Sequence, residues 1–129
     1  MVLIDTHVLI WMILQPKKLS EAARDALKQA RAETSVLIAD ITVWELAWLI
    51  ENHRISVFLT LERFLEEAVS KVVVEPITTE IASIAVRLPV AFPKDPVDRL
   101  IAATAISHRV PLVTADERIR SSRVAPTIW

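Results

Sequence analysis

Short runs of almost entirely apolar residues alternate with helix-like segments along this chain. Runs at residues 2–5, 35–39, 72–74 and 112–114 have the length of strands, and residues 126–129 add a candidate edge strand. A strand that is apolar at nearly every position is typical of a parallel sheet covered by helices on both faces. Because strands and helices alternate, we expect right-handed βαβ crossovers. The predicted fold is an α/β protein: a three-layer α/β/α sandwich with a central, mostly parallel sheet of four or five strands.

The segments between these runs carry the apolar spacing and the capping residues of helices. A helix over residues 7–14 ends before Pro16, and Ser20 caps a second helix that continues to about Ala32. Further helices are expected at residues 43–53, 60–70, 79–88 and 96–108, with a short helical turn after Asp116. No repeat or linker divides the chain, so residues 1–129 are expected to form a single domain.

The absence of two residue types narrows the possible chemistry. The chain has no Cys, which excludes thiol catalysis, thiolate zinc sites and disulfides. It has no Gly, which excludes the P-loop and the glycine-rich dinucleotide-binding turn. The three histidines, His7, His53 and His108, fall on separate elements without the spacing of a zinc site. Nucleotide-cofactor enzymes and zinc enzymes are therefore disfavoured.

The apolar and charged residues indicate where the protein acts and what it contacts. No apolar run reaches the roughly 18 residues that a membrane span requires, and no basic segment precedes the N-terminal apolar stretch, so a cytoplasmic location is expected. The net charge is −1, but residues 1–86 carry 8 Lys and Arg against 12 Asp and Glu, whereas residues 87–129 carry 7 against 4. Arginine forms paired contacts with phosphates. The candidates for such contacts, which are alternatively solvated side chains or ion-pair partners, are Arg87, Arg99, Arg109, Arg118, Arg120 and Arg123.

Acidic residues stand where apolar runs end or where the following helices begin. Asp5 ends the first run and Asp116 follows the fourth, while Glu45 and Asp98 each lie about one turn inside an expected helix. In open parallel sheets ligands bind beyond the carboxyl ends of the strands, so these four side chains are expected to meet at that edge. Carboxylate oxygens are the ligands that Mg²⁺ and Mn²⁺ prefer. The pattern therefore predicts metal-dependent phosphodiester chemistry.

Each of these acidic residues also has a structural interpretation. Asp95 precedes Pro96, a favoured first-turn residue, and is interpreted as a helix cap and not as a ligand. Thr42 and Glu45 have the Thr-x-x-Glu spacing of a capping box, which is a rival role for Glu45. A cap at the end of an element is the alternative for Asp5 and Asp116, whereas Asp40 is interpreted as a strand-end cap alone.

Motifs in four segments resemble those of PIN-domain proteins, in the same order and over the whole chain. They are Leu3–Trp11, Val43–Ala47, Asp95–Ala103 and Leu112–Asp116. The resemblance is greatest to the VapC-type toxins of prokaryotic toxin–antitoxin pairs. It implies a Mg²⁺- or Mn²⁺-dependent endoribonuclease that acts on RNA, is held inactive by a VapB-type antitoxin and is often a homodimer. It assigns the catalytic and metal-binding roles to Asp5, Glu45, Asp98 and Asp116. It assigns a site-lining role to Thr114 and Thr6.

Two alternatives to a nuclease remain open. A PIN-like domain that retains these acids can serve in binding and assembly without cleaving RNA. A phosphatase-like or receiver-like α/β domain also uses an acidic pocket, but the first expects Asp where this chain has His7. The second expects Lys where this chain has Thr114.

Tryptophans on the expected helices are candidates for an interaction surface. Trp44 and Trp48 lie four residues apart, beside an apolar stripe that includes Leu46, and Trp11 lies on the first helix. Tryptophan is enriched at interface hot spots, but it is also highly buried on average. We hypothesise that Trp48 helps to line a groove for an apolar antitoxin segment or a second copy of the chain. The alternative is that all three tryptophans belong to the core.

Overall fold

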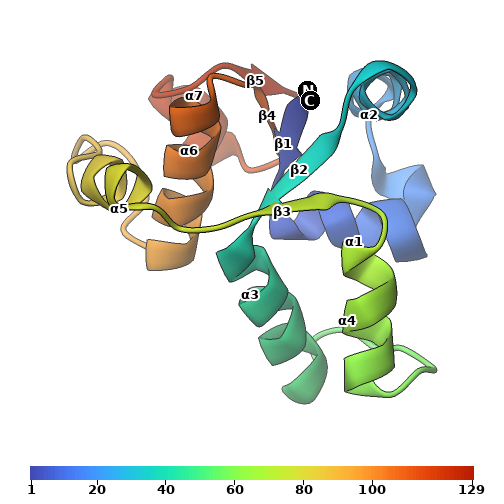
Figure 1. Ribbon diagram of the computed structural model, residues 1–129. Coiled ribbons are helices and arrows are strands. Elements are labelled where there is room, and N and C mark those ends of the chain that lie inside the picture. The colour runs from blue at the N-terminus through green and yellow to red at the C-terminus, as the bar shows by residue number, and fades with distance from the viewer.

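A five-stranded parallel sheet forms the centre of the structure, a computed structural model that describes residues 1–129 (Figure 1). All four strand pairings are parallel, and the order across the sheet is β3-β2-β1-β4-β5. The predicted sheet is confirmed, and the C-terminal segment is an edge strand. The strands are β1 (Val2–Ile4), β2 (Val36–Ala39), β3 (Val73–Glu75), β4 (Leu112–Val113) and β5 (Thr127–Ile128).

Helices occupy every long connection between the strands. Side-chain oxygens of Ser20, Thr60 and Thr78 accept hydrogen bonds from backbone N–H groups in the first turns of α2, α4 and α5. These caps satisfy donors that a helix start leaves without an internal partner. The helices are α1 (Thr6–Leu14), α2 (Glu21–Glu33), α3 (Asp40–Glu51), α4 (Leu61–Val69), α5 (Thr79–Val86), α6 (Pro96–His108) and α7 (Glu117–Ser122), with a 3₁₀ turn, η1 (Pro16–Lys18).

Alternate residues of the strands pack into two separate cores, one on each face of the sheet. Val2 and Ile4 of β1 join the core that α1, α2, α3 and α4 cover, whereas Leu3 joins the core beneath α6 and α7. Helix α5 packs on the outer side of α6 through Ile81 and Ala85 (Figure 1). Because both faces are covered, every residue of β1 is buried, which explains its uninterrupted apolar sequence. The predicted three-layer α/β/α architecture is confirmed.

The start of α3 differs from the prediction. The helix begins at Asp40, three residues before the expected start, and its N-cap residue Ala39 makes no capping hydrogen bond through its side chain. The capping box of Thr42 and Glu45 is therefore wrong. Thr42 is buried inside the first turn, where its Oγ1 accepts a hydrogen bond from Thr6 Oγ1 at 3.2 Å. This bond between α1 and α3 outweighs the local capping pattern, because a buried hydroxyl needs a partner.

Asp40 is not a strand-end cap either. It is the first residue of α3, and its Oδ2 accepts a hydrogen bond from the Ile77 N–H at 3.0 Å. The bond ties the segment after β3 to the start of α3 at the carboxyl ends of neighbouring strands. None of the helices is long and apolar enough to cross a membrane.

Candidate metal centre

Asp5 lies directly after the central strand β1 and is almost buried, with 9% of its surface exposed. Its Oδ1 accepts a hydrogen bond from the Val8 N–H at 2.9 Å and thereby caps α1. Asp5 also lines the acidic cavity, so the same residue has both of the roles that the sequence suggested. Burial raises the pKa of the Asp5 carboxyl, although hydrogen bonds from the Thr114 side chain and the Val8 amide and the nearby His7 oppose the rise. A nearby cation would therefore further stabilise the charged form of this carboxyl.

Asp116 and Thr114 follow strand β4, beside β1. Asp116 caps α7, because its Oδ1 accepts hydrogen bonds from the N–H groups of Arg118 at 2.8 Å and Ile119 at 3.3 Å. The resemblance implied that Thr114 lines the site. In the structure Thr114 is buried behind the cavity and is not part of its lining. Its Oγ1 accepts the Asp116 N–H at 3.1 Å, and its side chain hydrogen-bonds the Asp5 carboxyl. Thr114 therefore connects the two acidic residues and fixes their relative position.

Glu45 reaches the same edge of the sheet from α3, which follows strand β2. It lies three residues after Thr42, on the same face of the helix. The hydrogen bond from Thr6 to Thr42 joins the start of α1 to the start of α3, so it sets how the helix that carries Glu45 lies against Asp5. Thr6 itself is buried and forms part of the cavity wall, as the resemblance implied.

Asp98 lies in the first turn of α6, which begins at the carboxyl edge of the sheet and leads back to β4. Asp95 caps this helix by accepting the Val97 N–H at 2.8 Å, as the sequence predicts. The pKa of Asp98 is raised to about 6, first by burial and then by the negative charges of Asp95, Asp116 and Glu45, while Arg118 opposes the rise. At neutral pH the site therefore holds closely placed like charges that a cation would stabilise.

The four predicted acidic residues line a single cavity of about 350 Å³. Asp95 contributes a fifth carboxyl to the cavity wall. From the sequence, Asp95 is expected only to cap a helix, a role that it also has. His7 and Trp11 of α1 complete one side of the wall, and their rings lie 6.1 Å apart between centroids. The residues that line the cavity are Asp5, Thr6, His7, Trp11, Glu45, Asp95, Asp98, Ile101, Ala115, Asp116, Arg118 and Ile119.

Arg118 is the cation that the structure places on this cluster. Its Nη2 lies 3.1 Å from Asp116 Oδ2 and 3.8 Å from Asp98 Oδ2, and its Nε lies 3.4 Å from Asp116 Oδ1. Burial disfavours the charged form of Asp116, but hydrogen bonds from the Arg118 side chain and from the Arg118 and Ile119 amides outweigh it, so the pKa of Asp116 lies below its usual value. The sequence marked Arg118 only as one of several arginines; its position two residues after Asp116 was the available signal. Arg99, by contrast, donates to the carbonyl oxygens of Ala85 and Leu88 and has a structural role.

The donor set fits a hard divalent cation, but the side chains are not gathered around a single point. All of the acidic ligands offer carboxylate oxygens, and no Cys is present, which suits Mg²⁺ or Mn²⁺ better than zinc or copper. No group of three or more Asp, Glu or His side chains lies close enough together to hold a metal ion. Arg118 holds both oxygens of Asp116, and this contact keeps one of the carboxyls turned toward the guanidinium.

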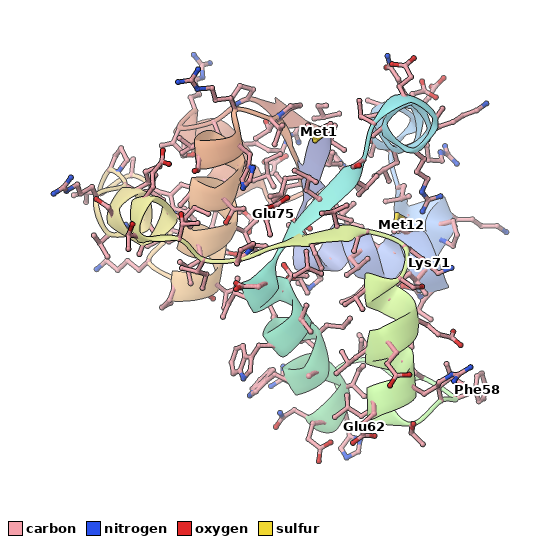
Figure 2. The ribbon with its side chains drawn as sticks, in the orientation of Figure 1. Met1, Met12, Phe58, Glu62, Lys71 and Glu75 are labelled. Atoms are coloured by element: carbon pink, nitrogen blue, oxygen red, sulfur yellow. The ribbon has the colours of Figure 1, made fainter.

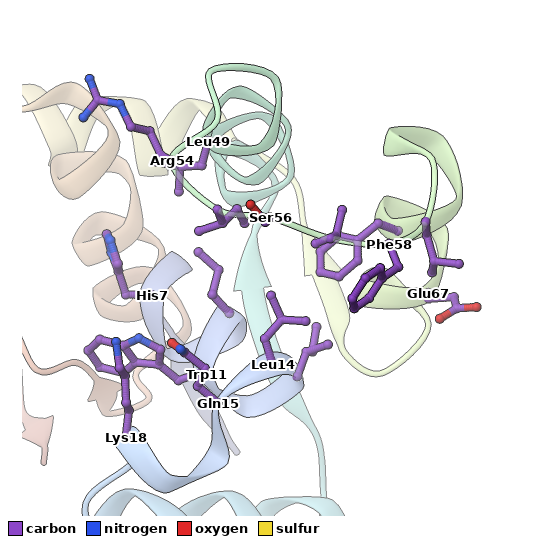
Figure 3. A pocket seen from close by; sticks show the side chains of 16 residues that line it. His7, Trp11, Leu14, Gln15, Lys18, Leu49, Arg54, Ser56, Phe58 and Glu67 are labelled. Carbon is purple, nitrogen blue, oxygen red and sulfur yellow. The ribbon is translucent and has the colours of Figure 1, made fainter.

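A larger apolar groove of about 1040 Å³ adjoins the acidic cavity. It runs between α1 and the segment of residues 52–60 that leads into α4, and His7 and Trp11 line both hollows (Figure 3). Leu14 and Phe58 present apolar surface to the groove, and Phe58 is fully exposed on its connecting segment (Figure 2). The charged side chains that line it are Lys18, Arg54 and Glu67. A molecule seated in the groove would therefore reach the edge of the acidic cavity.

The family model described as "PIN domain" matches residues 2–124. The chain belongs to the PIN-domain family. This PIN domain is 43% identical over 130 residues to "Ribonuclease VapC22" of Mycobacterium tuberculosis, and the match covers 99% of this chain and 98% of that protein. The structure of a toxin–antitoxin complex from Klebsiella pneumoniae matches with a TM-score of 0.63 and 26% identity, over 90% of this chain and 87% of that one. VapBC2 from Rickettsia felis, bound to a promoter DNA fragment, shares the fold with a TM-score of 0.74, 14% identity and coverage of 98% and 96%.

Proposed function

We propose that this PIN domain, a single domain over residues 1–129, is an endoribonuclease that depends on Mg²⁺ or Mn²⁺ and hydrolyses RNA phosphodiester bonds. The observation that carries the proposal is that Asp5, Glu45, Asp98 and Asp116 line one cavity at the carboxyl edge of the sheet. The 43% identity to a protein named as a ribonuclease, over almost the full length of both chains, supports RNA as the substrate. We propose that the protein acts on this substrate in the cytoplasm.

The residues of the cavity have separate tasks in the proposed reaction. Asp5, Asp98 and Asp116 would hold the ion directly or through water, and Glu45 would either add a ligand or orient the attacking water. A divalent cation held there supplies polarisation of the phosphate and lowers the pKa of a water molecule. Asp98 must lose its proton before it can bind a cation, and its pKa of about 6 allows this at neutral pH. Thr114 keeps Asp5 and Asp116 in register through its two hydrogen bonds.

Cleavage of single-stranded RNA by the purified protein is expected to require a divalent metal. The expected result is fragmentation of RNA in millimolar Mn²⁺ or Mg²⁺, complete loss of cleavage in EDTA, and recovery when Mn²⁺ is added back in excess. The measurement is the rate of fragment formation on a denaturing gel, with Asp5→Asn as the inactive control for contaminating nucleases. Cleavage in EDTA at the rate seen in Mn²⁺ would contradict the metal mechanism.

A binding or assembly module without nuclease activity is the second candidate. The observation that favours it is the contact of Arg118 with Asp98 and Asp116, which neutralises part of the acidic cluster without any metal ion. In that case the protein binds partners normally but produces no RNA fragments at any metal concentration. The cleavage assay therefore separates the two functions.

We further propose that a VapB-type antitoxin binds in the apolar groove. The two solved structures compared above are described as a toxin–antitoxin complex and as VapBC2. The groove offers an apolar floor with a fully exposed Phe58, and its lining residues His7 and Trp11 also line the acidic cavity. A segment of an antitoxin in this groove would bury apolar surface and close one side of the cavity at the same time, which gives inhibition a physical basis.

Phe58→Glu is expected to weaken binding of a VapB-type antitoxin by roughly 10-fold or more, because a charge replaces an apolar anchor at the interface. The melting temperature should barely change, since Phe58 is fully exposed. Trp48, which the sequence suggested for such a groove, does not line it. Val90→Glu is the matched control, because Val90 is 94% exposed and lines neither the groove nor the acidic cavity. Equal affinity of the wild type and Phe58→Glu, or an equal loss of affinity in Val90→Glu, would rule out the groove.

Trp44 and Trp48 are candidates for a homodimer surface. The core interpretation is wrong for both, because 56% of Trp44 and 42% of Trp48 is exposed, whereas Trp11 is half-buried against Trp129 with 5.6 Å between ring centroids. Large exposed aromatic side chains on one helix face favour a protein interface. We propose that a second copy of the chain covers them.

Trp48→Ala is expected to sediment as a monomer at concentrations where the wild type sediments as a dimer.

A further inference from the structure

Arg118 is the basic residue that forms ion pairs with carboxylates of the acidic cavity. The other pairs in the molecule, Arg63 with Glu67 and His108 with Glu75, lie outside that cavity. The guanidinium of Arg118 reaches two of the proposed metal ligands, at 3.1 Å from Asp116 Oδ2 and 3.8 Å from Asp98 Oδ2. The contact uses the flat, forked geometry of arginine, since Nε and Nη2 engage both oxygens of Asp116. The side chain thus supplies one positive charge to the two carboxylates that a divalent ion would share.

This contact competes with a metal ion for the same oxygens. Asp116 Oδ1 already accepts the backbone N–H groups of Arg118 and Ile119, so Oδ2 is the oxygen with more capacity for a further partner. Arg118 Nη2 holds that oxygen. A divalent cation that binds Asp116 and Asp98 must therefore either displace the guanidinium or tolerate a like charge beside it.

The position of Arg118 lets it leave the carboxylates without disturbing the fold. Its side chain is 70% exposed, and an exposed ion pair is only weakly held. Its backbone stays fixed at the rim, because the Arg118 N–H donates a hydrogen bond to Oδ1 of Asp116, the residue that caps α7. A released side chain would remain next to a cavity whose other charged walls are mostly carboxylates, where a polyanionic RNA strand has few cations to contact.

We propose that Arg118 is the internal counter-cation of the acidic cavity and that, when a divalent ion takes its place on Asp98 and Asp116, its freed guanidinium binds a phosphate of the RNA substrate. This inference rests on the proposed nuclease function. It assigns Arg118 a substrate-positioning role that follows from the exchange: the guanidinium fork that pairs with a carboxylate has the geometry to pair with a phosphate. The exchange couples metal binding to substrate binding, because neither carboxylates nor guanidinium is available while they are paired.

The first test measures Mn²⁺ affinity, by isothermal titration, in the wild type, Arg118→Ala and Arg120→Ala. Removing the competing cation is expected to tighten Mn²⁺ binding roughly 3- to 10-fold in Arg118→Ala. Arg120→Ala removes a charge from the same helix, but Arg120 has no ion pair in the cavity, so its affinity should match the wild type. Unchanged or weaker Mn²⁺ binding in Arg118→Ala, or an equal gain in Arg120→Ala, would overturn the counter-cation role.

The second test measures RNA cleavage at saturating Mn²⁺ as a function of salt. Arg118→Ala is expected to raise KM by roughly 10-fold with a smaller change in kcat, and to reduce the slope of log kcat/KM against log salt by about 0.7, the value for one lost phosphate contact on a single strand. Arg118→Lys keeps the charge but not the fork and should recover part of the KM effect. An unchanged KM and salt slope in Arg118→Ala would overturn the phosphate role.

The two failures can be told apart from a failure of the proposed function. If the wild type binds no Mn²⁺ and cleaves no RNA, the nuclease itself is refuted and the role of Arg118 falls with it. If the wild type binds Mn²⁺ and cleaves RNA but Arg118→Ala behaves identically in both tests, only the inference about Arg118 is refuted.

Discussion

Asp98→Asn is expected to lower RNA cleavage by roughly 100-fold or more and, at the same time, to make the metal-free protein more stable. The substitution removes a proposed metal ligand, so the reacting phosphate loses its cation. It also removes a charge that the fold disfavours, because burial and the charges of Asp95, Asp116 and Glu45 raise the pKa of Asp98 to about 6. The difference from the ordinary value, discounted for the partial exposure of the side chain, corresponds to about 1–2 kcal/mol of stability at pH 7.

The stability gain has a defined dependence on pH. A carboxyl whose pKa is raised in the folded state binds its proton more tightly there than in the unfolded chain. Its contribution to the stability of the wild type is therefore fully present below pH 3.8 and is lost as the pH rises through about 6. Asp98→Asn should exceed the wild type in stability at pH 7, and the difference should shrink toward zero near pH 4.

The measurement is denaturant unfolding in EDTA at both pH values, beside single-turnover cleavage in Mn²⁺. Asp25→Asn is the matched control, because Asp25 is exposed on α2 and lies away from the cavity. It should change neither activity nor stability by a measurable amount. A destabilised Asp98→Asn with unchanged cleavage would show that Asp98 has a structural role, as a first-turn residue of α6, and no role in catalysis.

The sequence predicts the position of the acidic residues well because a parallel sheet brings strand ends together. Asp5 and Asp116 each follow a parallel strand, and this alone places them at one edge of the sheet. The pairing of Leu3 with Leu112, which makes β1 and β4 neighbours, was not predicted. Helices that begin at that edge carry Glu45 and Asp98 to the same cavity. Four residues spread over more than a hundred positions of the chain could therefore be grouped without coordinates.

Most of the features that the sequence did not predict depend on contacts between distant segments. Helix α3 begins early because Thr42 pairs with Thr6, 36 residues away, and Asp40 binds Ile77, 37 residues away. Local capping patterns contain no information about either partner. The same holds for Thr114, whose place behind the cavity depends on the Asp5 carboxyl of another strand. Arg118 is a partial exception, since its contact with Asp116 is local, but its contact with Asp98 is not.

Millimolar Mn²⁺ is expected to raise the melting temperature of the wild type by about 5–10 °C at pH 7. The acidic cavity exists only in the folded protein, so an ion that binds there stabilises the native state, by about 2.7 kcal/mol when its concentration is 100 times Kd. The shift should be smaller at pH 5, because Asp98 is then mostly protonated and its proton must be released before the cation binds.

The double variant Asp5→Asn/Asp116→Asn is expected to abolish this shift while keeping the fold. Asp5 and Asp116 cap helices α1 and α7, and asparagine is as good an N-cap as aspartate, so the hydrogen bonds to Val8, Arg118 and Ile119 can persist. What the variant loses is two of the carboxylate charges that line the cavity. Thermal melts followed by circular dichroism, with and without Mn²⁺, measure both effects, and Asp25→Asn should retain the full shift. An equal shift in the double variant would mean that Mn²⁺ stabilises the protein from somewhere other than the edge where β1 and β4 end.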